Sequence, residues 1–241
     1  MGLFAGGGVW VRFAAVTAFY GAVAARLTRP SSSPLALAVC AGSCYACAVH
    51  GVVTALCMTD TAPWVIGKSQ ATGQVPLWSW LIWGPFHLTN RVFVAVAKAS
   101  HNRSHSLEVA TEVWPGWWLG GWYSYELGIK FAATVDLCCE LQERAETEKY
   151  MCCANWDGMV HGEDIARAAP FLAAAAKDGP VLVHCAHGVG RSTATILAAL
   201  VEAGHFETTE AAFAHCKKLR PVVKQSPRLK AALTSWLALR Q

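Results

Sequence analysis

Hydrophobic and polar positions divide the chain into two regions with different patterns. Three long apolar stretches dominate the first hundred residues and run over residues 3–27, 35–58 and 76–99. From about residue 105 onward, short apolar runs alternate with stretches in which apolar residues recur at helical spacing. The first pattern is typical of membrane helices. The second predicts an α/β domain, with a mostly parallel sheet covered by helices on both faces.

The second region gives a more detailed prediction. A strand, a turn and a second strand are expected within residues 111–121, and further strands at 133–137, 150–154 and 181–184. Helical patterns occupy residues 123–131, 163–177, 193–203, 208–219 and 227–239. About 130 residues are enough to build one such core. We therefore expect two parts, a hydrophobic helical membrane region over 1–104 and a compact domain over 105–241.

The segment Leu35–Met58 is the strongest membrane candidate. Its 24 residues include no Asp, Glu, Lys or Arg, and a helix of that length spans about 30 Å of hydrocarbon. The segment 3–27 is weaker because Arg12 interrupts it. The segment 76–99 combines an aromatic cluster with polar residues, so it suits a tilted, re-entrant or surface-lying helix as well as a full span.

Charge is distributed unevenly between the two regions. Residues 1–107 contain seven Lys or Arg residues and one acidic residue, Asp60, whereas residues 108–241 contain thirteen basic and fifteen acidic residues. The slightly acidic second region argues against a nucleic-acid-binding surface there. Three spans would place the Arg26 and Arg29 loop on the same side as Lys98. We expect an integral membrane protein whose second region faces the cytosol, in a membrane that the sequence leaves open.

A nine-residue loop contains the candidate chemistry. Its sequence is HCAHGVGRS, from His184 to Ser192, and it follows an apolar strand and opens a helix. Glycines in the loop supply the backbone freedom with which several amides turn onto one anion, and the helix N-terminus adds the positive end of its dipole. The loop therefore predicts a phosphate-sized anion site. Its expected binding residues are Ala186, His187, Gly188, Val189, Gly190 and Arg191.

Residue types in the loop indicate a reaction. A cysteine at a helix N-terminus and near a cation becomes a thiolate, so Cys185 is the candidate nucleophile. Arg191 offers a planar fork for two phosphate oxygens, and the hydroxyl of Ser192 donates to the thiolate when it leaves. His184 is expected to order the loop by hydrogen bonding. His187 either adds positive charge or points outward.

The loop resembles the HCxxGxxRS signature of the cysteine-dependent protein tyrosine and dual-specificity phosphatase superfamily, and the resemblance extends over about residues 108–240. It implies a phosphocysteine mechanism that uses neither a metal nor a cofactor. It also implies an upstream Asp that protonates the leaving oxygen and then activates water. The best match is Asp157, in the sequence ANWDG. The alternative role for this residue is a turn or a helix cap.

The expected function is that of a membrane-anchored phosphomonoester hydrolase, most consistent with a protein tyrosine or dual-specificity phosphatase. Its partners would be a phosphorylated protein and membrane lipids, with no nucleic acid. One alternative is a phospholipid monoester phosphatase at the bilayer, although the loop has no lysine for a polyanionic headgroup. A further alternative is a phosphate-binding membrane scaffold without catalysis.

Ten cysteines raise the question of metals and disulfides. Cys40, Cys44 and Cys47 have a spacing found in some iron–sulfur enzymes, but they lie inside the candidate membrane helix, where Cys is an ordinary small apolar residue. Paired CxxC motifs for zinc do not occur in the sequence. The pairs at 138–139 and 152–153 suit core packing, with an oxidative disulfide to Cys185 as the alternative.

Overall fold

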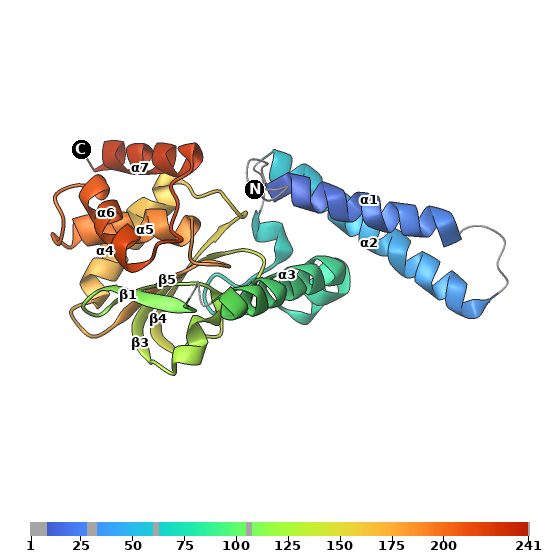
Figure 1. Cartoon of the computed structure of the whole chain (residues 1–241), viewed down its shortest axis with the longest axis horizontal. Helices are drawn as coiled ribbons and strands as arrows, with labels where there is room; N and C mark the ends of the chain where they lie inside the picture. Colours follow the sequence, from blue (N-terminus) through green and yellow to red (C-terminus); the bar gives the residue numbers. More distant parts are fainter. Residues whose placement is uncertain (1–8, 28–32, 60–62, 105–107, 241) are drawn as a thin grey trace.

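Two long helices project from a body that contains the sheet (Figure 1). In this computed structural model the described residues are 9–27, 33–59, 63–104 and 108–240. The projecting pair is α1 (Val9–Leu27) and α2 (Pro34–Met58), and α3 (Leu77–Ser104) follows. The start of the expected segment 3–27, together with Arg29 and Asp60, lies outside the described residues.

The body contains a five-stranded sheet. Its strands are β1 (Ala110–Trp114), β2 (Trp117–Gly120), β3 (Phe131–Cys138), β4 (Thr147–Asn155) and β5 (Val181–His184). Their spatial order is β1-β2-β5-β3-β4. Only β1 and β2 pair antiparallel, while β2, β5, β3 and β4 are parallel neighbours. The α/β fold with a parallel-rich sheet is therefore confirmed, and β5 has the bounds that the sequence predicts.

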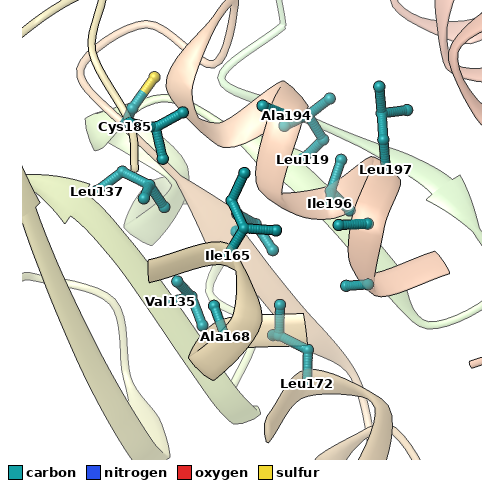
Figure 2. Packing of buried hydrophobic residues seen from close by; sticks show 14 of the residues in the cluster. Leu119, Val135, Leu137, Ile165, Ala168, Leu172, Cys185, Ala194, Ile196 and Leu197 are labelled. Carbon is teal, nitrogen blue, oxygen red and sulfur yellow. The ribbon is translucent and has the colours of Figure 1, made fainter. Parts of the chain in front are cut away.

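Two helices pack directly against the strands at the centre of the sheet. They are α4 (Gly162–Ala175) and α5 (Arg191–Glu202), which are followed by α6 (Thr209–Leu219) and α7 (Pro227–Leu239). Figure 2 shows Ile165, Ala168 and Leu172 of α4 lying against the strand residues Val135 and Leu137. These helix positions recur every three to four residues, which places them on one apolar face. Burying each large apolar side chain stabilises the fold by about 1.5–3 kcal/mol.

Residues from the amino-terminal region are built into the packing of this body. A 3-10 helix, η1 (Pro63–Ile66), leads to Lys68, whose buried ammonium contacts the carboxylate of Asp136 on β3. The amide of Glu143 donates to the carbonyl of Gly73 over 2.9 Å. The segment before α3 therefore contacts the sheet. Side-chain packing thus continues across the boundary at residue 104 that the sequence predicts between the membrane region and the compact domain.

One expected helix is wrong in its type and extent. In place of a helix over 123–131, the structure has the 3-10 helix η2 (Trp122–Leu127). It ends at Gly128, which adopts the left-handed conformation at φ 64°. A glycine in this conformation is a common helix terminator because it has no Cβ to clash, and β3 then begins at Phe131.

The helix α3 bends and contacts the sheet-bearing body. Its backbone leaves helical geometry at Trp83, close to Pro85, whose ring cannot follow a regular helix. Arg91 donates to Gln142 over 3.0 Å, and Lys98 pairs with Glu126. Within the described ranges, α2 is the one helix long and apolar enough to cross a membrane by length and composition. Polar residues of the expected segment 76–99 thus contact protein.

A second apolar cluster joins the three amino-terminal helices to the end of the sheet. Phe86 of α3 is fully buried and meets Trp156 edge to face, with 6.3 Å between ring centroids. Phe13 of α1 packs on Phe86 at 5.4 Å. The buried residues of this cluster are Phe13, Val49, Val53, Cys57, Ile66, Phe86, Cys139, Trp156 and Met159. Through this cluster, α1 lies beside the segment that follows β4.

Candidate active site

The loop from Cys185 to Gly190 joins β5 to α5 at the carboxyl end of the parallel strands, which is where ligands bind in open α/β sheets. Gly188 adopts φ 67°, and a Cβ at this position would lie 2.5 Å from the carbonyl carbon of Gly120. A side chain is therefore excluded both by the backbone conformation and by the neighbouring strand. The amide of Gly188 donates to the sulfur of Cys185 over 3.3 Å.

Cys185 lies among groups that favour its thiolate form. Its sulfur lies 3.3 Å from the hydroxyl oxygen of Ser192. Burial raises the pKa of this thiol, but the charge of Arg191 and hydrogen bonds from Ser192 and the loop amides outweigh it, so the pKa is lowered overall. Figure 2 shows the sulfur pointing away from the apolar side chains of the core. The group is thus ionised more readily than an ordinary cysteine.

Arg191 is held in place from several directions. Its guanidinium donates to the backbone oxygens of Leu137 and Asn155 over 3.0 and 2.7 Å. The two terminal nitrogens also reach the carboxylate of Glu140, at 3.1 and 2.5 Å. Burial lowers the pKa of Arg191, and the Glu140 carboxylate raises it by more, so the side chain stays charged. This fork is therefore rigid before any ligand arrives.

Asp157 lies beside this guanidinium, shortly after the end of β4. Its Oδ1 is 3.4 Å from Arg191, and its Oδ2 accepts a 2.9 Å hydrogen bond from Arg12 of α1. The side chain is 30% exposed, which leaves one side open to a ligand. Burial raises the pKa of Asp157, but the charges of Arg191 and Arg12 outweigh it and lower the pKa.

The structure thus brings the four expected catalytic residues, Cys185, Arg191, Asp157 and Ser192, to one place. The expected anion-binding residues 186–190 form the loop around the sulfur. His187 meets Phe93 of α3 edge to face at 5.6 Å. Burial lowers the pKa of His187, and the nearby Asp157 raises it by less. The imidazole of His187 thus packs against α3, and the expectation that it adds positive charge to the loop stays a prediction.

His184 is anchored beneath the loop. Its Nε2 lies 2.7 Å from a carboxylate oxygen of Glu143. Burial lowers the pKa of His184, but the carboxylates of Glu143 and Asp136 raise it to about 9. The same pair lowers the pKa of Glu143 to about 2, against the effect of burial. The histidine before the nucleophile is thus a buried cation that fixes the end of β5.

Four site residues were not found from the sequence. Glu140 and Glu143 follow β3, and their only signal was a position near the carboxyl end of a predicted strand. Arg220 donates to the carbonyls of Gly188 and His187 over 2.9 and 3.3 Å, and it supports the loop from behind. The sequence marks Arg12 only as a charge that interrupts an apolar segment, and nothing in the sequence connects it with the distant loop.

One cluster of potential metal ligands occurs among the described residues. Donor atoms of Asp136, Cys138 and His184 all lie within 4.8 Å of one another. The ammonium of Lys68, however, already contacts Asp136 and donates to the carbonyl of Cys138 over 2.7 Å. Two fixed positive groups, Lys68 and the His184 imidazolium, oppose a cation here. None of the ten cysteines forms a disulfide.

Comparison with known proteins identifies the part of the chain that contains this site. Residues 126–238 match the family model of the dual specificity phosphatase catalytic domain. The chain is similar in structure to a variant of human DUSP28, with TM-score 0.49 and 21% identity over 55% of this chain and 97% of that one. A mouse putative dual specificity phosphatase complexed with zinc tungstate gives TM-score 0.49 and 22% identity, over 55% and 89%.

A third similar structure is that of PTPMT1 in complex with PI(5)P. Its TM-score is 0.43 and its identity is 14%, over 56% of this chain and 100% of that one. No curated protein matches the chain.

Proposed function

We propose that the chain is a membrane-anchored enzyme that hydrolyses phosphomonoesters through a phosphocysteine intermediate, and the match of residues 126–238 to the dual specificity phosphatase catalytic domain supports this. The observation that carries the proposal is the position of the Cys185 sulfur, which is within 3.3 Å of both the Ser192 hydroxyl and the Gly188 amide. Donors that surround a sulfur in this way stabilise a thiolate and then the oxygens of a phosphoryl group bound to it.

The first step transfers the phosphoryl group to the enzyme. The Cys185 thiolate attacks phosphorus, and the bond from phosphorus to the ester oxygen breaks. Arg191 and the loop amides stabilise the charge on the transferred group. Asp157, in its protonated form, donates a proton to the leaving oxygen, which departs as an alcohol or a phenol.

The second step releases phosphate. Asp157, now ionised, removes a proton from water as the water attacks phosphorus, and the bond from sulfur to phosphorus breaks. The hydroxyl of Ser192 donates to the departing thiolate. The Nε–H of Arg191 makes no hydrogen bond within the described part of the chain, and it is one donor that a bound oxyanion would satisfy.

The superfamily points to phosphorylated tyrosine as the first substrate class, with serine and threonine beside it. A phospholipid monoester is the second candidate, and a specific observation favours it: an apolar cavity adjoins the loop at Ala186 and His187. A scaffold that only binds phosphate is disfavoured, because Cys185 and Asp157, the proposed nucleophile and acid, both lie close to the guanidinium of Arg191.

Anchoring is proposed through α2. This helix has 25 residues and a mean hydropathy of 1.7, and it is the described helix that meets the length and composition of a span. We place the catalytic residues on the cytosolic side, because four of the seven basic residues of region 1–107 follow α2 on their side in the sequence, namely Lys68, Arg91, Lys98 and Arg103. Asn102 begins an Asn-Arg-Ser sequon, so a glycan on Asn102 in cells would contradict this orientation.

Hydrolysis of 4-nitrophenyl phosphate by the full chain in detergent micelles tests the reaction. We expect Cys185→Ser to lower kcat by at least about 10³-fold, because the hydroxyl that replaces the thiolate is a far weaker nucleophile. Cys44→Ser, which changes an exposed thiol on α2, is the matched control and should retain full activity. Equal activity of Cys185→Ser and wild type would overturn the proposed mechanism.

A further inference from the structure

A cavity of about 550 Å³ lies between α1 and α3 and ends at the catalytic loop. Its volume falls within the range of about 300–1,000 Å³ that is usual for small-molecule sites. Both helices come from the amino-terminal region, and the loop end is formed by Asp157, Ala186 and His187. The main apolar side chains along its walls are Val16, Phe19, Phe86, Leu88, Val92 and Phe93.

Charge is confined to one end of this cavity. The charged or chargeable side chains at the catalytic end are Arg12, Glu140, Asp157 and His187. Each of them contacts the loop or belongs to it, through Arg191 or through Asp157. Away from the loop, the polar groups of Thr89 and Asn90 are already engaged, with His50 and the carbonyl of Phe86. A ligand in this cavity would therefore need a polar head at the loop and an apolar remainder.

The two ends are joined by a short chain of contacts. The ring of Phe93 meets His187 of the loop edge to face, and the guanidinium of Arg12 lies 5.2 Å from the centre of the same ring. Phe93 thus forms a wall that leads from the anion site into the apolar space, with the guanidinium of Arg12 against its ring. A flexible apolar chain attached to the phosphate has a direct path along this wall.

The rim of the cavity is apolar and exposed. Phe19 on α1 and Leu88 on α3 are 63% and 60% exposed, and Val92 is 53% exposed. Apolar surface left in water costs about 25 cal/mol per Å², so a contiguous patch of this kind usually marks a binding surface. On its other side α1 packs along α2, the helix long enough to span a membrane. The cavity therefore opens near the proposed bilayer.

We infer that this cavity binds the acyl chain of a lipid phosphomonoester while the loop from Cys185 to Arg191 binds its single phosphate. The inference rests on the proposed function and names its substrate class. The reaction is unchanged: the thiolate takes the phosphoryl group, Asp157 protonates the lipid alkoxide, and water then releases inorganic phosphate and restores the thiolate. A lysine-free loop agrees with one phosphate on the headgroup.

A homologous series of n-alkyl phosphates tests the inference. These esters share one leaving-group reactivity, so differences in kcat/KM report the binding of the chain. With the full protein in digitonin micelles, we expect kcat/KM to rise about threefold to fourfold per methylene that becomes buried, and to level off once the cavity is full. Hydrolysis of 4-nitrophenyl phosphate, measured alongside and lost in Cys185→Ser, reports the proposed function separately.

Two variants of α3 distinguish binding of the alkyl chain in the cavity from partition of the ester into micelles. Val92→Trp adds bulk inside the cavity, and we expect it to reduce the ratio of long-chain to short-chain kcat/KM by at least tenfold. Val96→Trp makes the same change one turn later, at an exposed position outside the cavity, and should leave the ratio as in wild type. Partition into micelles would affect both variants alike.

The outcomes separate the two proposals. A kcat/KM independent of chain length, in an enzyme that still hydrolyses 4-nitrophenyl phosphate through Cys185, would overturn the acyl-chain site alone. The same holds if Val92→Trp and Val96→Trp show equal chain-length dependence. A phosphotyrosine peptide whose kcat/KM relative to that of 4-nitrophenyl phosphate falls in Val92→Trp but not in Val96→Trp, with no chain-length dependence among the alkyl phosphates, would assign the cavity to a protein partner. If the wild-type protein does not hydrolyse 4-nitrophenyl phosphate, or if Cys185→Ser hydrolyses it equally well, the proposed function itself is overturned.

Discussion

The guanidinium of Arg12, on the first helix of the chain, donates a 2.9 Å hydrogen bond to Asp157, the candidate general acid. The two residues are 145 positions apart in the sequence. Together with Arg191 this contact lowers the pKa of Asp157, against the effect of burial. A residue of the amino-terminal helix thereby affects the protonation of the proposed general acid.

Arg12→Gln is expected to change the pH dependence of the reaction. The reaction needs Cys185 as a thiolate and Asp157 in its protonated form. Because the pKa of each group is lowered, we expect kcat/KM to reach its maximum below neutral pH. Removing the Arg12 charge raises the pKa of Asp157, so the basic limb of the profile should move to higher pH. Arg12 is 35% exposed, so solvent screening reduces the effect.

The control for this prediction is Arg26→Gln, which removes a cation from the exposed last turn of the same helix. Its pH profile should match that of wild type. If both variants shift the basic limb equally, the effect comes from the charge of the whole helix and the assigned contact with Asp157 is wrong.

Glu140→Gln is expected to loosen the arginine fork. Glu140 accepts from both terminal nitrogens of Arg191, and without its charge the guanidinium is no longer fixed for the phosphate. Misplacement of a catalytic group by about 1 Å costs about 10²-fold in rate, so we expect a loss of that size in kcat. Glu140→Asp keeps the charge and should recover part of it. A KM change with kcat unaffected would contradict this positioning role.

Glu143→Gln tests the buried pair with His184 through stability. The pKa of His184 is raised from 6.5 to about 9, so its contribution is fully present below pH 6.5 and is lost as the pH rises through 9. The pKa of Glu143 is lowered from 4.5 to about 2, so its contribution is present above pH 4.5 and is lost as the pH falls through 2. The pair stabilises most between these limits.

At pH 6, Glu143→Gln should lower the free energy of unfolding by about 3 kcal/mol, because it leaves a buried charge without its partner. It should also flatten the decline in stability that the wild type shows between pH 6.5 and 9. Denaturant unfolding at several pH values measures both effects. An unchanged slope over that interval would show that His184 does not titrate with the pair.

Gly188→Ala is expected to disrupt the loop. Gly188 and Gly204 both have positive φ, of 67° and 77°, but only Gly188 has neighbours that a Cβ would meet. Backbone strain alone costs about 1–2 kcal/mol, which is the expected effect of Gly204→Ala, with activity retained. Gly188→Ala adds a clash with Gly120 and should abolish turnover. Equal effects of the two substitutions would show that the close approach to Gly120 is not essential.

Patterns local in the sequence predicted the fold well. The strand Val181–His184 is a short apolar run between a Gly-Pro turn and a glycine-rich loop, and it was predicted with its observed bounds. The end of η2 was missed because Gly128 terminates the helix by its left-handed conformation, whereas the apolar pattern continues through it. Propensity and periodicity describe such segments, but not the backbone state of one residue.

The candidate site was predicted only in part, for a physical reason. Cys185, Arg191 and Ser192 lie within one loop, so their spacing contains the geometry. The partners Glu140, Glu143 and Arg12 are 41 to 145 positions away from the groups that they contact. An isolated Glu or Arg in the sequence is indistinguishable from a solvated charge until the strands and helices are packed together.

Trapping the phosphocysteine intermediate tests the proposed mechanism most directly. Ser192→Ala removes the hydroxyl that lies 3.3 Å from the Cys185 sulfur, so release of the thiolate should become slow and the intermediate should accumulate. We expect a burst of 4-nitrophenol and, after rapid acid quenching, a phosphoryl group on the peptide that contains Cys185, found by mass spectrometry. A phosphoryl group on any other residue, or steady turnover with no burst and no labelled peptide, would contradict the mechanism.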